Sequence, residues 1–219
     1  MRKLFLGALA ALVIGFAAPA EARDYVVALT YAAPANAQAG EPSVALGAIT
    51  DGREHAVNWL GAIRGGYGNP LKVLVTEGPV ADAVGESVGA GLAARNLATA
   101  DGARFRLDVH IVQFDCNQYA RKEAHIELTA RLFDTATGAV VYERNTRVDR
   151  VEGSVLSLRT GIFASHEELR ALANAALQEA VDSALDEPGL RAAFAAAPVA
   201  PAPAAPADAP ADAATTTSP

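Results

Sequence analysis

Ser87 stands in a Gly-Glu-Ser-Val-Gly run, which matches the G-x-S-x-G pattern that holds the nucleophile of serine hydrolases. That chemistry needs the serine on a strained turn directly after a strand. Here the match lies inside a helical pattern that begins near Pro79, so a chance match is the favoured interpretation. The overlapping run 89–94 mimics a dinucleotide-binding motif, but it also lies in mid-helix, where no free amides can meet a phosphate.

Two histidines have the setting of metal ligands. His110 and His125 fall on polar positions of strand patterns, beside Asp108 and Glu127, and two histidines with carboxylates can bind zinc. The favoured interpretation is a solvated face of a sheet, where such residues are common. The sequence therefore predicts no metal, no cofactor and no catalytic residues, and a protein that is not an enzyme.

Aromatic and arginine side chains gather in one glycine-rich region, at Arg53, Trp59, Arg64 and Tyr67. Residues of these types often anchor a ligand or a partner protein. A single tryptophan is nevertheless more often a core residue than an anchor. Run 65–70 lacks the Lys-Ser/Thr pair of a phosphate-binding loop and has the composition of a hairpin connection. These four residues are the predicted ligand- or partner-binding site.

Three consecutive strand patterns, from residue 103 to residue 148, organise the chain around these positions. In the first, polar residues alternate with Phe105, Leu107, Val109 and Ile111. The parity then changes at Val112 and Phe114, which predicts a β-bulge near Ile111. A second alternating run, 124–132, is joined by a short loop, 134–138, to a third. Clean alternation predicts an antiparallel meander with one solvated and one covered face.

Shorter patterns complete the fold. A strand or an extended arm is predicted at 24–32, and strands are predicted at 43–49, 59–64 and 71–76. A helix that opens at Pro79 contains three glycines, which predicts that it packs closely on the sheet or on another helix. Ser165 and Glu168 form a capping box for a closing helix that ends before Pro188. The predicted fold class is therefore α+β: an antiparallel sheet with a three-strand meander and two main helices packed on one face.

The first 22 residues have the pattern of a signal peptide. A basic start precedes an apolar run of 13 residues, 4–16, which is short for a bilayer span, and cleavage is predicted between Ala22 and Arg23. No cysteine lies there for lipid attachment, so we expect a periplasmic protein that is not lipid-anchored and has no transmembrane span in its mature chain. Residues 23–195 form one predicted domain. Residues 196–219, mostly Ala, Pro, Asp and Thr, form a predicted disordered tail that could lie near the cell wall.

The net charge and the cysteine content limit the classes of partner that the chain can bind. Removing residues 1–22 takes away Arg2, Lys3 and Glu21, which leaves 16 basic and 24 acidic residues and a formal charge of −8. This excess of acidic residues argues against binding to nucleic acid and against electrostatic binding to anionic lipid. Cys116 is the single cysteine of the chain, so it forms no internal disulfide, and its place near the end of a strand predicts burial.

The order of several segments carries a family resemblance. These segments are Val44 to Arg53, residues 60–61 and 76–80, the meander 105–148, and the closing helix with residues 184–190. In this order the chain resembles the YajG-like envelope lipoproteins. The resemblance implies an α+β domain with two helices on an antiparallel sheet, located in the periplasm, and it supplies no catalytic residues. The chain departs from that group at Arg23, where those lipoproteins carry an acylated cysteine.

Three functions remain open from the sequence. The favoured one is a binding or assembly module of the cell envelope, with an unknown envelope protein or a lipid as partner. The second is an auxiliary component of envelope lipid or polymer transport, with an apolar groove between the helices and the sheet. A metal-dependent hydrolase built around His110 and His125 is the least favoured.

Overall fold

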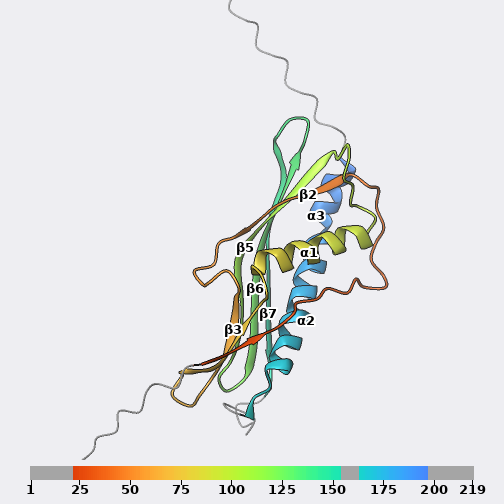
Figure 1. Ribbon diagram of the computed structural model, residues 1–219. Coiled ribbons are helices and arrows are strands. Elements are labelled where there is room, and N and C mark those ends of the chain that lie inside the picture. Colours follow the sequence, from red (N-terminus) through yellow and green to blue (C-terminus); the bar gives the residue numbers. More distant parts are fainter. Residues whose placement is uncertain (1–21, 154–162, 197–219) are drawn as a thin grey trace, which may run out of the picture.

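The computed structural model describes residues 22–153 and 163–196, in which three helices pack against one sheet (Figure 1). Apart from Ala22, the predicted signal peptide lies outside these ranges, and so, apart from Ala196, does the predicted tail. The strands are β1 Arg23–Val26, β2 Val44–Asp51, β3 Trp59–Arg64, β4 Pro70–Val75, β5 Phe105–Gln118, β6 Lys122–Asp134 and β7 Val140–Glu152. The helices are α1 Val80–Ala94, α2 His166–Leu185 and α3 Pro188–Ala195. The predicted α+β class is confirmed.

β5, β6 and β7 form the predicted antiparallel meander. The pairing of β5 with β6 shifts between Ile111 and Gln113, which leaves Val112 as the extra residue. The Val112 side chain is 41% exposed, whereas Phe114 and Cys116 beyond it are fully buried. The predicted bulge is therefore confirmed, and so is the predicted burial of Cys116. The bulge returns the apolar residues of the second half of β5 to the core.

The sheet is mixed, with strand order β1-β4-β3-β5-β6-β7 and with β2 as a further neighbour of β5. The predicted antiparallel pairing holds for the meander and for β3 with β4, whereas β1 joins β4, and both β2 and β3 join β5, in parallel. β2 pairs with β5 as far as Ile111, and β3 pairs with residues 116–118, so the two strands follow each other along one edge of β5. Alternation fixes the face that a strand buries and not its neighbour, so the sequence does not predict these parallel pairs.

α1 and α2 lie on the same face of the sheet, α1 across β2 and α2 along β6 and β7 (Figure 1). The Ser165 hydroxyl accepts a hydrogen bond from the Glu168 backbone N–H at 3.3 Å, which confirms the cap at the start of α2. A Cβ on Gly91 would come within 2.7 Å of Leu185 and 3.0 Å of Val181, so the close approach of the two helices requires glycine there. Within the described ranges, no helix is both long enough and apolar enough to cross a membrane.

A buried arginine joins the C-terminal ends of the two helices. The Arg95 side chain is fully buried, and all five of its N–H donors are used. Two go to the carboxylate of Asp186, one to Asp182, one to the Tyr31 hydroxyl and one to the Gly91 carbonyl. The acidic partners lie 91 and 87 residues away along the chain, so the sequence pattern does not reveal this cluster. It ties α1, α2 and the segment after β1 into one unit.

Candidate functional site

β3 divides the four predicted site residues into two pairs. Arg53 and Trp59 lie where the strand begins, whereas Arg64 ends it and Tyr67 lies in the turn beyond. A strand of this length spans about 20 Å. A small ligand at one pair therefore cannot contact the other, and the predicted site is two separate places.

The Arg53 side chain lies between the end of β2 and the start of β3, at the edge of β5. We call this region the fork, and its residues are Asp51, Arg53, Val57, Trp59 and Phe114. The Arg53 side chain is 3% exposed. Its Nε and Nη2 donate to the two carboxylate oxygens of Asp51, each at 2.8 Å. Nη1 donates to the carbonyls of Trp59 and Phe114, at 2.8 and 3.0 Å, and Nη2 donates to that of Val57 at 3.2 Å. All five donors are occupied, so Arg53 has none left for a ligand.

The other contacts at the fork are also internal. Hydrogen bonds from Arg53 hold the pKa of the Asp51 carboxyl below its ordinary value, so the pair stays ionised at neutral pH. The half-buried Trp59 ring lies against the His55 ring, with 3.9 Å between the ring centroids. Between the residues that pair with β2 and those that pair with β3, this edge of β5 has no strand partner. There the Arg53 guanidinium donates to the Phe114 carbonyl in place of a neighbouring strand. Structural contacts thus explain both predicted residues at this end of β3.

The opposite end of β3 is built differently. The β3–β4 turn contacts the β5–β6 turn, because the Tyr119 hydroxyl donates to the Gly66 carbonyl at 2.8 Å. Tyr67 is fully exposed and Tyr119 is 52% exposed. Arg64 is half-buried and, within the described residues, makes one hydrogen bond, to the Gly68 carbonyl at 3.2 Å.

The segment before α2 and the start of β1 complete this surface. Lys72 Nζ donates to the Ala164 carbonyl at 2.7 Å, beside Phe163, which is 77% exposed. The cationic groups of Arg23 and Lys72 lie 5.5 and 5.8 Å from the centroid of the Tyr25 ring. We call this surface the turn end, and its residues are Arg23, Tyr25, Arg64, Tyr67, Lys72, Tyr119, Arg121 and Phe163.

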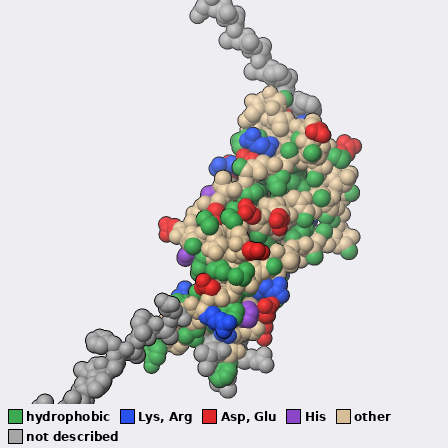
Figure 2. Space-filling view, viewed as in Figure 1, with side chains coloured by type: hydrophobic (Ala, Val, Ile, Leu, Met, Phe, Trp, Pro, Cys, Tyr) green, Lys and Arg blue, Asp and Glu red, His purple; other side chains and the backbone are tan. Residues whose placement is uncertain are grey.

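The turn end is the lower end of the molecule in Figure 1, where β1 begins. In the same view, Figure 2 shows basic and acidic side chains side by side there, with hydrophobic side chains at the outermost points. The two turns, residues 64–70 and 119–121, contain two arginines, two tyrosines and no acidic residue. Arg64 and Tyr67 are among the residues predicted from the sequence, whereas Tyr119 and Phe163 are not. An aromatic residue between two strand patterns, as at Tyr119, is the signal that could have found it.

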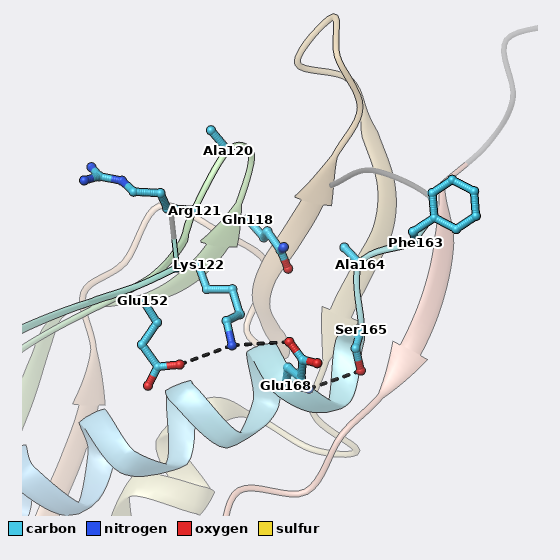
Figure 3. Close-up of a pocket in the computed structure, with 10 residues that line it drawn as sticks. Gln118, Ala120, Arg121, Lys122, Glu152, Phe163, Ala164, Ser165 and Glu168 are labelled. Carbon is cyan, nitrogen blue, oxygen red and sulfur yellow. Dashed lines mark hydrogen bonds and ion pairs between the residues drawn. The ribbon is translucent and has the colours of Figure 1, made fainter. Parts of the chain in front are cut away.

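A pocket of about 170 Å³ lies beside the turn end, between the β5–β6 turn, the end of β7 and the start of α2 (Figure 3). Lys122 Nζ points between Glu152 and Glu168, at 3.1 and 3.3 Å, whereas Arg121 and Phe163 extend away from the pocket. Burial opposes the charged form, but the two carboxylates outweigh it and raise the pKa of Lys122. A nucleophilic lysine needs a lowered pKa, so this geometry makes Lys122 an ion-paired cation.

The nucleophile candidates have structural surroundings. Ser87 lies in the middle of α1, as predicted, and its hydroxyl donates to the Ala83 carbonyl at 2.7 Å, one turn back in the same helix. Burial raises the pKa of the Cys116 thiol, which keeps it protonated and unreactive.

The two predicted histidines lie on the outer face of the sheet. His110 contacts the Thr50 hydroxyl at 2.9 Å, and His125 contacts the Asp149 carboxylate at 2.6 Å. His110 pairs with Thr129 on β6, four residues from His125, so the two are about 13 Å apart. Among the residues that the structure describes, no group of three or more His, Cys, Asp and Glu is placed to hold a metal ion.

The fold can be compared with known proteins. No family model and no curated protein matches the sequence. The structure is similar to protein XCC0632 of the DUF330 family, from Xanthomonas campestris, with a TM-score of 0.58 and 15% identity over 78% of this chain and 98% of that one. Matches also include the PelC dodecamer from Paraburkholderia phytofirmans (TM-score 0.39, 16% identity, 67% and 89% covered). Lipoprotein GNA1162 from Neisseria meningitidis matches with a TM-score of 0.25 and 11% identity, with 63% and 97% covered.

These comparisons show a shared fold and no more. The likeness to XCC0632 places the chain in a class of α+β proteins with that architecture, and the lower TM-scores of the other two carry no argument. Among the matching structures are two that are named as lipoproteins and one that is named as an uncharacterised protein. Membership of the YajG-like group itself stays a prediction.

Proposed function

We propose that the chain is a non-catalytic binding or assembly module of the cell envelope, exported to the periplasm, and that it engages its partner through the turn end. One observation carries this proposal. The donors of the buried arginines Arg53 and Arg95 are all used internally, whereas the turn end presents exposed aromatic rings and the exposed arginines Arg23 and Arg121. Exposed aromatic and arginine side chains that protrude together are typical of a binding surface.

The alternative of lipid or polymer transport needs an apolar groove between the helices and the sheet. The cavity found there, lined by residues of α1, α2, β5 and β6, has a volume of about 10 Å³. A single water molecule needs about 10–15 Å³, so this space does not accept an acyl chain. The space between α1, α2, β5 and β6 therefore does not support this alternative, although a surface pocket of about 390 Å³ lies between the β1 segment and the start of α1.

Capture from envelope extract tests the proposal. The immobilised chain is compared with the double variant Tyr67→Ser/Phe163→Ser and with Val140→Ser, an exposed apolar residue at the opposite end of the molecule. A chain ending at residue 195 tests the tail in the same way. Retention of one partner by the wild type and Val140→Ser, and its loss from the double variant, supports the proposal. Equal capture by all three, or turnover of ester, peptide or glycan substrates, overturns it.

A further inference from the structure

We infer that the turn end docks on the headgroup layer of an anionic lipid bilayer. The inference rests on the proposed binding role and adds the chemistry of the partner. It depends on the shape of the turn end, on its local charge, and on where residues 1–22 join the body.

The aromatic rings of the turn end protrude from three separate segments. Tyr67 is fully exposed, Phe163 is 77% exposed and Tyr119 is 52% exposed. They come from the β3–β4 turn, the residues before α2 and the β5–β6 turn, so they form raised points and not a flat apolar patch. A rigid protein partner would need a matching hollow for each ring. A headgroup layer accepts such rings without one, and tyrosine is enriched at that depth.

The local charge of the turn end differs from that of the whole chain. Within the described residues, the guanidinium groups of Arg23 and Arg64 contact no carboxylate. The acidic groups nearby are mostly paired: Glu123 with Arg121 at 3.1 Å, and Glu152 and Glu168 with Lys122. Asp24 is also exposed and follows Arg23 directly in the chain, so it offsets part of the positive charge there.

The acidic excess behind the charge of −8 lies elsewhere, for example at Glu77, Asp82 and Glu86 beside α1. The sequence-based expectation against an electrostatic grip on anionic lipid used the average charge. At the turn end Arg23 and Arg64 remain without a carboxylate partner among the described residues, so their guanidinium groups can meet lipid phosphates.

The N-terminal segment joins the body at this same end. β1 begins at Arg23, whose register partner is Lys72, so the apolar run 4–16 precedes the turn end by only a few residues. A chain held in a bilayer by this run during export presents the turn end to the lipid. After the predicted cleavage, the new α-amino group of Arg23 adds a further positive charge there. A second copy of the chain is a poorer occupant, because the arginine-bearing turns of the two copies would repel each other.

Vesicle flotation tests the inference. The exported chain is mixed with vesicles of phosphatidylethanolamine and phosphatidylglycerol, or with vesicles of phosphatidylcholine alone. We expect binding to the anionic vesicles, a loss of about tenfold or more in Tyr67→Ser/Phe163→Ser, a loss of about fivefold in Arg64→Gln, and no change in Val140→Ser. Absence of binding to anionic vesicles, equal binding to phosphatidylcholine, or an equal loss in Val140→Ser overturns it.

Trp59 provides a second readout, because it is the one tryptophan of the chain and lies at the far end of β3. Brominated lipids quench a tryptophan that enters the bilayer. We expect no quenching of Trp59 in the wild type and strong quenching of the variant Tyr67→Trp in a Trp59→Phe background. Quenching of Trp59, or none at position 67, overturns the docking geometry.

The two proposals fail in different ways. If no variant binds vesicles but envelope capture still depends on Tyr67 and Phe163, the lipid inference is wrong and the binding role stands. If vesicle binding follows the turn-end variants but substrate is turned over, the lipid inference stands and the non-catalytic role is wrong.

Discussion

The two ends of β3 carry the same residue types with opposite environments. At the fork, Arg53 gives every donor to the protein and Trp59 lies against His55. At the turn end, Arg64 has a single hydrogen bond within the described residues and Tyr67 is fully exposed. The same aromatic and cationic groups therefore hold a strand junction at one end and are available for a partner at the other. Saturation of hydrogen bonds, and not residue type, distinguishes the structural Arg53 from Arg64, which we propose to contact a partner.

Substitution of Arg53 at the fork and of Arg64 at the turn end should give the largest difference in the free energy of unfolding. Arg53→Met leaves the Asp51 carboxylate and three backbone carbonyls without their donor, so we expect the free energy of unfolding to fall by about 3–5 kcal/mol. Arg64→Met should change it by less than about 0.5 kcal/mol. Urea unfolding followed by Trp59 fluorescence measures both. Equal losses would show that the fork is not held by Arg53.

Substitution of Gly61 and of Gly66 should give the next largest difference in stability. A Cβ on Gly61 would lie 1.6 Å from the Cys116 carbonyl oxygen, so β3 must shift away from β5 in Gly61→Ala. We expect a loss of about 1–3 kcal/mol. Gly66 has no atom within 4 Å of the corresponding position, and Gly66→Ala should be neutral within about 0.5 kcal/mol. Thermal unfolding followed by circular dichroism distinguishes them, and a neutral Gly61→Ala would contradict the β3–β5 pairing.

The aromatic pair should differ more modestly. Trp59→Ala removes a half-buried ring, so we expect a loss of about 1–2 kcal/mol, less than for a fully buried side chain. Tyr67→Ala removes a ring that buries nothing, and the expected change is below about 0.5 kcal/mol. Chemical unfolding followed by circular dichroism serves both variants, since the first lacks tryptophan. A Tyr67→Ala variant as unstable as Trp59→Ala would mean that the turn end is structural.

The smallest expected difference is in the pH dependence of stability. The pKa of Asp51 is lowered in the folded state, so its contribution is complete above the ordinary value of 3.8 and is lost as the pH falls below it. One such group contributes a slope of at most about 1.4 kcal/mol per pH unit. Asp51→Asn should reduce the acid slope without abolishing it, because Asp186 and Asp149 also have lowered pKa values. Arg64→Met should leave the slope unchanged in the same urea titrations, and an unaltered slope in Asp51→Asn would contradict the Arg53 pairing.

Local patterns in the sequence were sufficient for the meander, the bulge and the helix cap. The change of parity after Ile111 predicted the bulge because one extra residue has a visible effect on alternation. The fork could not be predicted in this way. Its acceptors are backbone carbonyls of Val57, Trp59 and Phe114, which every residue possesses, so their convergence on Arg53 leaves no mark in the residue types. Phe163 was missed for a related reason, since a single aromatic residue has no periodicity.

The long strands of the meander set a fixed distance between the two places where the chain leaves the described body. Ala22 adjoins the turn end, whereas Ala196 accepts a hydrogen bond from Arg104, just before the start of β5. β5 has 14 residues and spans about 45 Å. A surface bound at the turn end would therefore lie a fixed distance from Ala196, at the other end of β5.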